Sequence, residues 1–132
     1  MSELYNDGCY QSFEETTLQA LLDKEGFAVE LDTNENTVKL ATGPDDAIGV
    51  LHSRNTMESK EVTVRLFGCG GTYKAKAGGV IAKGARVKVA NGGKFVASTA
   101  GDRSVGLKRT QGSAADDDLI EVIDSVEFDP QA

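Results

Sequence analysis

Few side chains in this 132-residue chain could do covalent chemistry. The sequence contains two cysteines, Cys9 and Cys69, and one histidine, His52. A nucleophilic Cys69 would need a base to deprotonate it and a third group to orient that base. His52 is the only histidine that could serve as the base, and the sequence assigns no orienting group. We therefore interpret His52 as structural and expect no catalytic residues and no enzymatic activity.

Two acidic stretches have the composition of cation sites. Asp32-x-Asn34-x-Asn36 resembles the start of an EF-hand calcium loop, but the sixth position is Thr37 instead of glycine and the twelfth is Gly43 instead of glutamate. The run Asp116-Asp117-Asp118 places consecutive carboxylates on alternate sides of an extended chain. We interpret the first as a hairpin turn and the second as a solvated loop, and predict no metal.

Cofactor and disulfide signatures are also missing from the sequence. Gly68-Cys69-Gly70-Gly71 lacks the Gly-Lys-Ser/Thr ending of a phosphate-binding loop, so we expect no cofactor. The two cysteines lie far apart without a Cys-x-x-Cys pair, which disfavours a disulfide framework.

Composition limits the partners. The chain has 21 acidic and 14 basic residues and a formal net charge of -7, which disfavours nucleic acid as a partner. No apolar run approaches the roughly 18 residues of a membrane span, and the N-terminus does not resemble a signal peptide. We expect no membrane association and synthesis in the cytoplasm.

The elements that must position any site are mostly β-strands. Val87 and Val89 alternate with polar residues, Asn91-Gly92-Gly93 is a tight-turn signal, and Phe95 and Ala97 resume the alternation, which predicts a β-hairpin. Further strands are expected at Phe27–Leu31, Val38–Leu40, Ala47–Leu51 and Val62–Phe67, with an additional strand at Thr72–Ala75.

The N-terminal part follows another pattern. Residues 1–11 have scattered apolar side chains without periodicity and are expected to form an arm. Ser12 and Glu15 fit a capping box, and Leu18, Leu21 and Leu22 fall on one stripe, which predicts a short helix over 12–23 that ends before Gly26.

The predicted strands repeat along the chain. Gly26-x-x-Val29-x-Leu31 matches Gly84-x-x-Val87-x-Val89 at an offset of 58 residues, and Ile48-Gly49-Val50 matches Val105-Gly106-Leu107 at 57. Two such units can bury their apolar faces against each other. We predict a mainly β, compact barrel or sandwich, made of two tandem four-strand repeats in one domain. Its segments are an arm and helix (1–25), a first repeat (26–67), a Gly-rich linker (68–83) and a second repeat with the tail (84–132).

The stretch from Phe67 to Leu107, with its Lys-Ala-Gly-Gly-Val-Ile-Ala-Lys-Gly-Ala-Arg-Val-Lys-Val segment, Asn-Gly-Gly-Lys-Phe-Val turn and Ser-Val-Gly-Leu end, resembles the decoration (cement) proteins of tailed-phage capsids. The resemblance covers roughly 26–123. It implies a β-tulip-like core, a location on the outer surface of the virion capsid, and stabilisation of joints between major capsid subunits. It also implies a homo-oligomer, dimer or trimer, on the capsid. It carries over no catalytic or ligand residues, only the framework glycines Gly26, Gly49, Gly84 and Gly106.

An arm that pairs with a capsid edge would use its apolar side chains as anchors. The candidate capsid contacts are Leu4, Tyr5, Tyr10 and Phe13.

A carrier module of the biotinyl or lipoyl type is the alternative, because such modules are also quasi-symmetric β-structures. They present a lysine at the tip of a hairpin. Here Lys74 and Lys76 lack the flanking Met or Asp residues of such sites.

Overall fold

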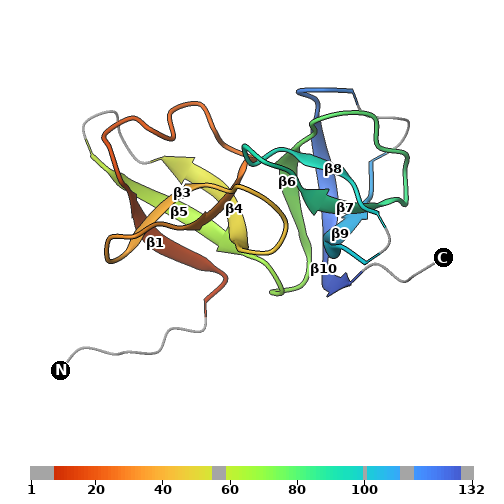
Figure 1. The fold of residues 1–132 in the computed structure, drawn as a ribbon, viewed down its shortest axis with the longest axis horizontal. Helices are drawn as coiled ribbons and strands as arrows, with labels where there is room; N and C mark the ends of the chain where they lie inside the picture. Colours follow the sequence, from red (N-terminus) through yellow and green to blue (C-terminus); the bar gives the residue numbers. More distant parts are fainter. Residues whose placement is uncertain (1–7, 55–58, 100, 111–114, 129–132) are drawn as a thin grey trace.

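The structure is a computed structural model that describes residues 8–54, 59–99, 101–110 and 115–128. Within these ranges the chain forms ten β-strands and no helix. The described part of the chain thus has no helical segment that could span a lipid bilayer. Figure 1 shows two β-bodies next to each other, the first from red to yellow-green and the second from green to blue. The mainly β fold predicted from the alternating strands is confirmed.

The first half is a closed five-stranded barrel. Its strands are β1 (Tyr10–Glu15), β2 (Ala28–Leu31), β3 (Thr37–Leu40), β4 (Ala47–Arg54) and β5 (Glu61–Leu66). Around the barrel the order is β1-β3-β2-β4-β5, and β1 closes the ring against β5. β1 and β3 run parallel, and the other pairings in this barrel are antiparallel.

The second half is a five-stranded sheet that nearly closes in the same way. Its strands are β6 (Thr72–Lys76), β7 (Arg86–Val89), β8 (Phe95–Ala97), β9 (Arg103–Lys108) and β10 (Leu119–Phe128). Their order is β6-β10-β9-β7-β8. Ala77, directly after β6, forms a parallel bridge with Phe95 of β8, so the two edges of the sheet meet.

The predicted tandem repeat is present, and it is one strand longer than expected. β2 to β5 correspond in order to β7 to β10, and β1 corresponds to β6, because each of these two strands runs antiparallel to the last strand of its half. The parallel contacts also correspond: Glu14 pairs with Thr37, and Ala77 pairs with Phe95. Thr37 and Phe95 are 58 residues apart, which is the offset that relates the two repeats in the sequence.

The framework glycines occupy equivalent positions in the two halves. A Cβ atom at Gly49 would lie 2.3 Å from a carbonyl oxygen of the neighbouring strand, and one at Gly106 would lie 2.4 Å from such an oxygen. Gly26 and Gly84 precede the equivalent strands β2 and β7 and have φ angles of +90° and +82°, which favour glycine. The repeat therefore preserves backbone geometry as well as apolar spacing.

The predicted helix over 12–23 is wrong. Ser12 and Phe13 lie in strand β1, and the Ser12 hydroxyl donates to Glu61 Oε2 at 2.8 Å instead of capping a helix. Glu15 is buried and accepts hydrogen bonds from the backbone amides of Gln19 (2.7 Å) and Leu21 (2.9 Å), so its carboxylate organises an irregular turn. Pairing with β5, about fifty residues along the chain, overrides the local helix signal.

Two apolar clusters fill the fold, and one of them is shared between the halves. The first lies within the first barrel and consists of Leu21, Val29, Val38, Leu51, Val62 and Val64. The second is centred on the second half, where Val87, Val89 and Phe95 are fully buried, but it also includes side chains of the first barrel, namely Ala28, Ala41, Ala47 and Val50. Burial of apolar surface therefore stabilises the contact between the halves as well as each half.

Backbone hydrogen bonds reinforce that contact. The predicted turn Asn91-Gly92-Gly93 lies against the first barrel, where the Gly92 amide donates to Ala41 O at 2.8 Å and the Ala28 amide donates to Gly93 O at 2.7 Å. A Cβ atom at Gly93 would lie 2.7 Å from Ala28 O. The hairpin turn is therefore part of the contact between the two halves.

Candidate functional site

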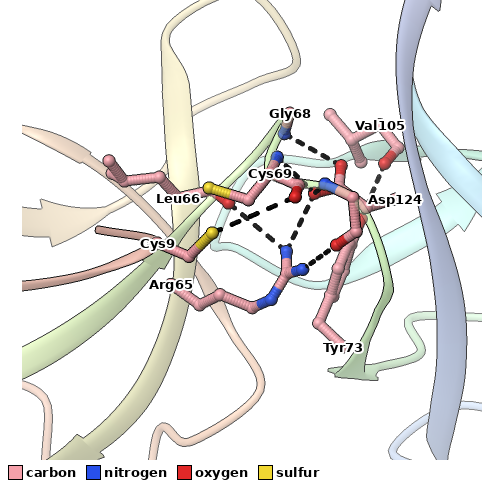
Figure 2. A network of polar contacts seen from close by, with 9 residues as sticks. Cys9, Arg65, Leu66, Gly68, Cys69, Tyr73, Val105 and Asp124 are labelled. Atoms are coloured by element: carbon pink, nitrogen blue, oxygen red, sulfur yellow. Dashed lines mark hydrogen bonds and ion pairs between the residues drawn. The ribbon is translucent and has the colours of Figure 1, made fainter. Parts of the chain in front are cut away.

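An ion pair lies where the two halves meet (Figure 2). Arg65 belongs to β5 and Asp124 to β10, and Arg65 Nη1 lies 2.9 Å from Asp124 Oδ2. The side chain of Asp124 is 0% exposed and that of Arg65 is 8% exposed. Burial lowers the pKa of the Arg65 guanidinium, but the hydrogen bond and charge of Asp124 outweigh this effect and raise its pKa above the usual value.

The loop between β5 and β6 wraps around the Asp124 carboxylate. The amides of Gly68, Cys69 and Gly70 donate to its oxygens at 2.9, 2.8 and 3.2 Å. Gly68 and Gly70 have φ angles of +87° and +85°, which turn these successive amides toward one acceptor. The Gly70 carbonyl in turn accepts a hydrogen bond from Arg65 Nη2. Asp124 therefore fixes the connection between the two halves.

Tyr73 joins the second core to this network. Its hydroxyl donates to Val105 O at 2.9 Å, and its ring packs against Phe67 and Phe95 with centroid distances of 5.6 and 6.0 Å. The Arg65 guanidinium lies 5.3 Å from the centre of the Tyr73 ring. Burial, followed by the charge of Asp124, raises the pKa of Tyr73 well above its usual value, so this residue stays a neutral hydrogen-bond donor.

A groove of about 740 Å³ lies beside the network, between the halves. One wall is the outward face of β6 and β10, where Lys74 is opposite Glu121 and Lys76 is opposite Leu119. Tyr10 of the first barrel contributes to the other wall. Tyr10 and Leu119 are 53% and 54% exposed, so two large apolar side chains that line the groove are open to solvent.

The structure describes two of the four candidate capsid contacts, and these two lie in different environments. Leu4 and Tyr5 lie outside the described residues. Phe13 is partly buried and packs against the first core, whereas Tyr10 is exposed at the groove. The Tyr10 ring packs edge-on against His52 with a centroid distance of 4.8 Å. Of the two candidates that the structure describes, Tyr10 is therefore the more accessible to a partner.

His52 and Cys69 do not form the pair that nucleophilic catalysis would need. His52 packs on Tyr10, whereas Cys69 lies beside Cys9, whose thiol donates to the Cys69 carbonyl oxygen with an Sγ–O distance of 4.0 Å. The hydrogen bond with Cys9 and, next, burial raise the pKa of Cys69, which is the opposite of an activated thiol.

Neither Lys74 nor Lys76 lies at a hairpin tip, where the alternative, a carrier module, would present its lysine. Lys74 and Lys76 lie within β6 and pair with Glu121 and Leu119 of β10. Of the two acidic stretches, 32–36 forms the turn between β2 and β3, and Asp116 and Asp117 form ion pairs with Lys94 at 3.1 and 2.6 Å.

Sequence reasoning missed Arg65 and Asp124 as partners. Val62, Val64 and Leu66 alternate in β5, and this pattern places Arg65 on the outward, solvent-facing side. Arg65 does point out of the first barrel, but the second half covers it, so that the residue is only 6% exposed. The one signal of this ion pair in the sequence was a charged residue, Arg65, within a valine-rich strand.

No protein-family model matches this sequence, and no curated protein matches it. Among solved structures, the fold is similar to the crystal structure of the N base of the head fiber gp8.5 of bacteriophage phi29. The TM-score is 0.58, the sequence identity is 14%, and the match covers 88% of this chain and 94% of that one. The similarity therefore extends over both halves of the described fold.

Proposed function

We propose that this chain is a structural virion protein that binds the outer surface of a tailed-phage capsid as a decoration or cement protein. The observation that carries the proposal is the similarity of the whole two-part fold to the base of a phage head fiber. The resemblance of residues 26–123 to capsid decoration proteins supports it independently, because it rests on sequence patterns. On this proposal the partner is the major capsid protein.

Attachment would stabilise the shell by mass action. A protein that binds the assembled, expanded shell and not the precursor shifts the equilibrium toward the expanded state, and many copies on a lattice add their effects. The chain needs no catalytic group for this role. Rigid connection of its two halves through Arg65 and Asp124 would let one chain bridge neighbouring capsid subunits.

We assign the contact to the segment before β1 together with Tyr10. Tyr10 is the first residue of β1 and lies at the groove between the halves, which exposed Leu119 also lines. A partner segment there would meet the apolar side chains of Tyr10 and Leu119 as well as the charged side chains of Lys74 and Glu121. A dimer or trimer on the capsid is part of the proposal.

Co-sedimentation tests the proposal. The purified chain is mixed with expanded empty heads or with procapsids of the phage that encodes it, and an unrelated acidic protein of similar mass serves as the control. Saturable sedimentation with expanded heads, above the control, is the expected result. Sedimentation no greater than the control would overturn the proposal. Light scattering of the free chain distinguishes monomer, dimer and trimer.

A further inference from the structure

The two cysteines of this chain lie close together at one end of the first barrel, just before β1 and just after β5. Cys9 precedes β1, and Cys69 lies in the loop that joins the two halves, 60 residues further along. The Cys9 thiol donates to the Cys69 carbonyl oxygen with an Sγ–O distance of 4.0 Å, and the Cys9 side chain is the largest cause of the raised pKa of Cys69. Figure 2 shows both sulfur atoms beside the Arg65–Asp124 network.

The backbone on each side of this contact is held in place. The Leu66 amide donates to Cys9 O at 2.9 Å, which extends the pairing of β1 with β5 by one residue. The Cys69 amide donates to Asp124 Oδ2 at 2.8 Å. The folded chain therefore positions both thiols, although nothing in their sequence spacing suggests that they meet.

Neither cysteine is buried in the fold. Cys69 is exposed and Cys9 is partly exposed, and both are free thiols in this structure. Structural cysteines that are inert are usually buried in apolar surroundings, which is not the case here.

We propose that Cys9 and Cys69 are a redox pair that closes to an intramolecular disulfide when the folded chain meets a low-molecular-weight disulfide such as oxidised glutathione. The Cys69 thiolate attacks one sulfur of the reagent, forms a mixed disulfide and releases the first reduced thiol. The Cys9 thiolate then attacks the Cys69 sulfur and releases the second. The two protein thiols lose two protons and two electrons, and the reagent is reduced to two thiols.

The disulfide would connect the start of β1 to the loop between the two halves. The bond would close a 60-residue segment that contains the whole first barrel, and a loop of this length restricts the unfolded chain strongly. The inference goes beyond capsid binding and does not depend on it.

The test uses the folded, reduced, full-length chain with oxidised glutathione. The expected product is a monomer that is lighter by about 2 Da, because two hydrogens are lost. Peptide mapping without reductant should find the Cys9 and Cys69 peptides joined. The unfolding midpoint should rise by about 10 °C and return to the starting value after reduction. Closure should be faster at pH 9 than at pH 7, because contact with Cys9 and burial raise the pKa of Cys69.

The single variants Cys9→Ser and Cys69→Ser are the matched controls. Each retains one thiol and should gain one glutathione without any rise in the unfolding midpoint. The inference would be overturned if the wild-type chain mainly carried two glutathione adducts or formed disulfide-linked dimers. A closed monomer whose midpoint does not rise would contradict the stabilising role.

Discussion

Leu66 and Asp124 occupy equivalent positions in the two repeats, yet one is apolar and the other is a buried carboxylate. Leu66 pairs with Gly49 on β4, and Asp124 pairs with Gly106 on β9. The Asp124 carboxylate binds Arg65 at 2.9 Å and accepts the amides of Gly68, Cys69 and Gly70. The second repeat thus differs from the first at Asp124, whose carboxylate binds the loop between β5 and β6 that joins the two halves.

Replacement of Asp124 by asparagine should destabilise the chain strongly. The variant leaves the Arg65 guanidinium buried without its counter-ion, and loss of one partner of a buried pair costs about 3 kcal/mol. Urea unfolding measures the difference. Asp116→Asn is the matched control, because Asp116 is 64% exposed and Lys94 keeps its ion pair with Asp117; its stability should be nearly that of the wild type. Equal stabilities of the two variants would contradict the role of Asp124.

Alanine at Gly49 or Gly106 should be poorly tolerated in both halves. The new Cβ would lie 2.3 Å from the Arg65 carbonyl oxygen in one case and 2.4 Å from the Ile123 carbonyl oxygen in the other. Relief of either clash requires separation of paired strands, at about 3 kcal/mol. Gly43→Ala is the control, because a Cβ there meets nothing within 4 Å. In thermal unfolding, the midpoint of Gly43→Ala should be near that of the wild type, and the midpoints of the other two variants should be well below it. Similar midpoints for all three variants would contradict the close approach of these glycines to the neighbouring strand.

Stability should fall in acid partly through the Lys88–Asp102 pair. The hydrogen bonds from Lys88 and, next, Thr99 lower the pKa of Asp102 below its usual 3.8. Because the folded-state pKa is the lower one, the stabilisation is fully present above the unfolded pKa and is lost as the pH falls through the folded pKa. Lys88→Met should therefore be less stable than the wild type at pH 6, and the two free energies of unfolding should converge as the pH falls below the lowered pKa of Asp102. Parallel curves over this range would show that the pair contributes nothing to the acid sensitivity.

Capsid attachment should depend on the N-terminal segment and Tyr10. Deletion of residues 1–7 leaves β1 and its pairing with β5 intact, and Tyr10→Ala removes the exposed ring at the groove. Tyr10→Ala should weaken binding to expanded heads by about tenfold, the effect of losing one interface anchor, and the deletion, which removes Leu4 and Tyr5, should weaken it by at least as much. Leu31→Ala is a comparable control, since Leu31 is 59% exposed on β2. Occupancy of the heads that is unchanged by the deletion would rule out attachment through this segment.

Local patterns predicted much of the fold. The hairpin of β7 and β8 follows from alternation at Val87 and Val89 and from the turn signal Asn91-Gly92-Gly93, all within a dozen residues. The repeat was visible because the two halves place glycine and β-branched residues at the same spacing. The additional strand at Thr72–Ala75 was also predicted, and β6 occupies it.

Contacts between distant residues could not be predicted in the same way. The spacing of Leu18, Leu21 and Leu22 indicated a helix, but β1 takes Ser12 and Phe13 because its partner β5 is about fifty residues away. Arg65 and Asp124 are 59 residues apart, and Cys9 and Cys69 are 60 apart. The first pair meets because the two halves pack together, and the second because β1 pairs with β5; no local window of the sequence describes either contact.

The most direct measurement is a reconstruction, by electron cryomicroscopy, of expanded heads with and without the purified chain. We expect additional density on the outer surface, at joints between major capsid subunits. Both halves of the fold should dock into this density, and the segment before β1 should face the shell. Identical maps at saturating protein, or density only inside the shell, would contradict this expectation.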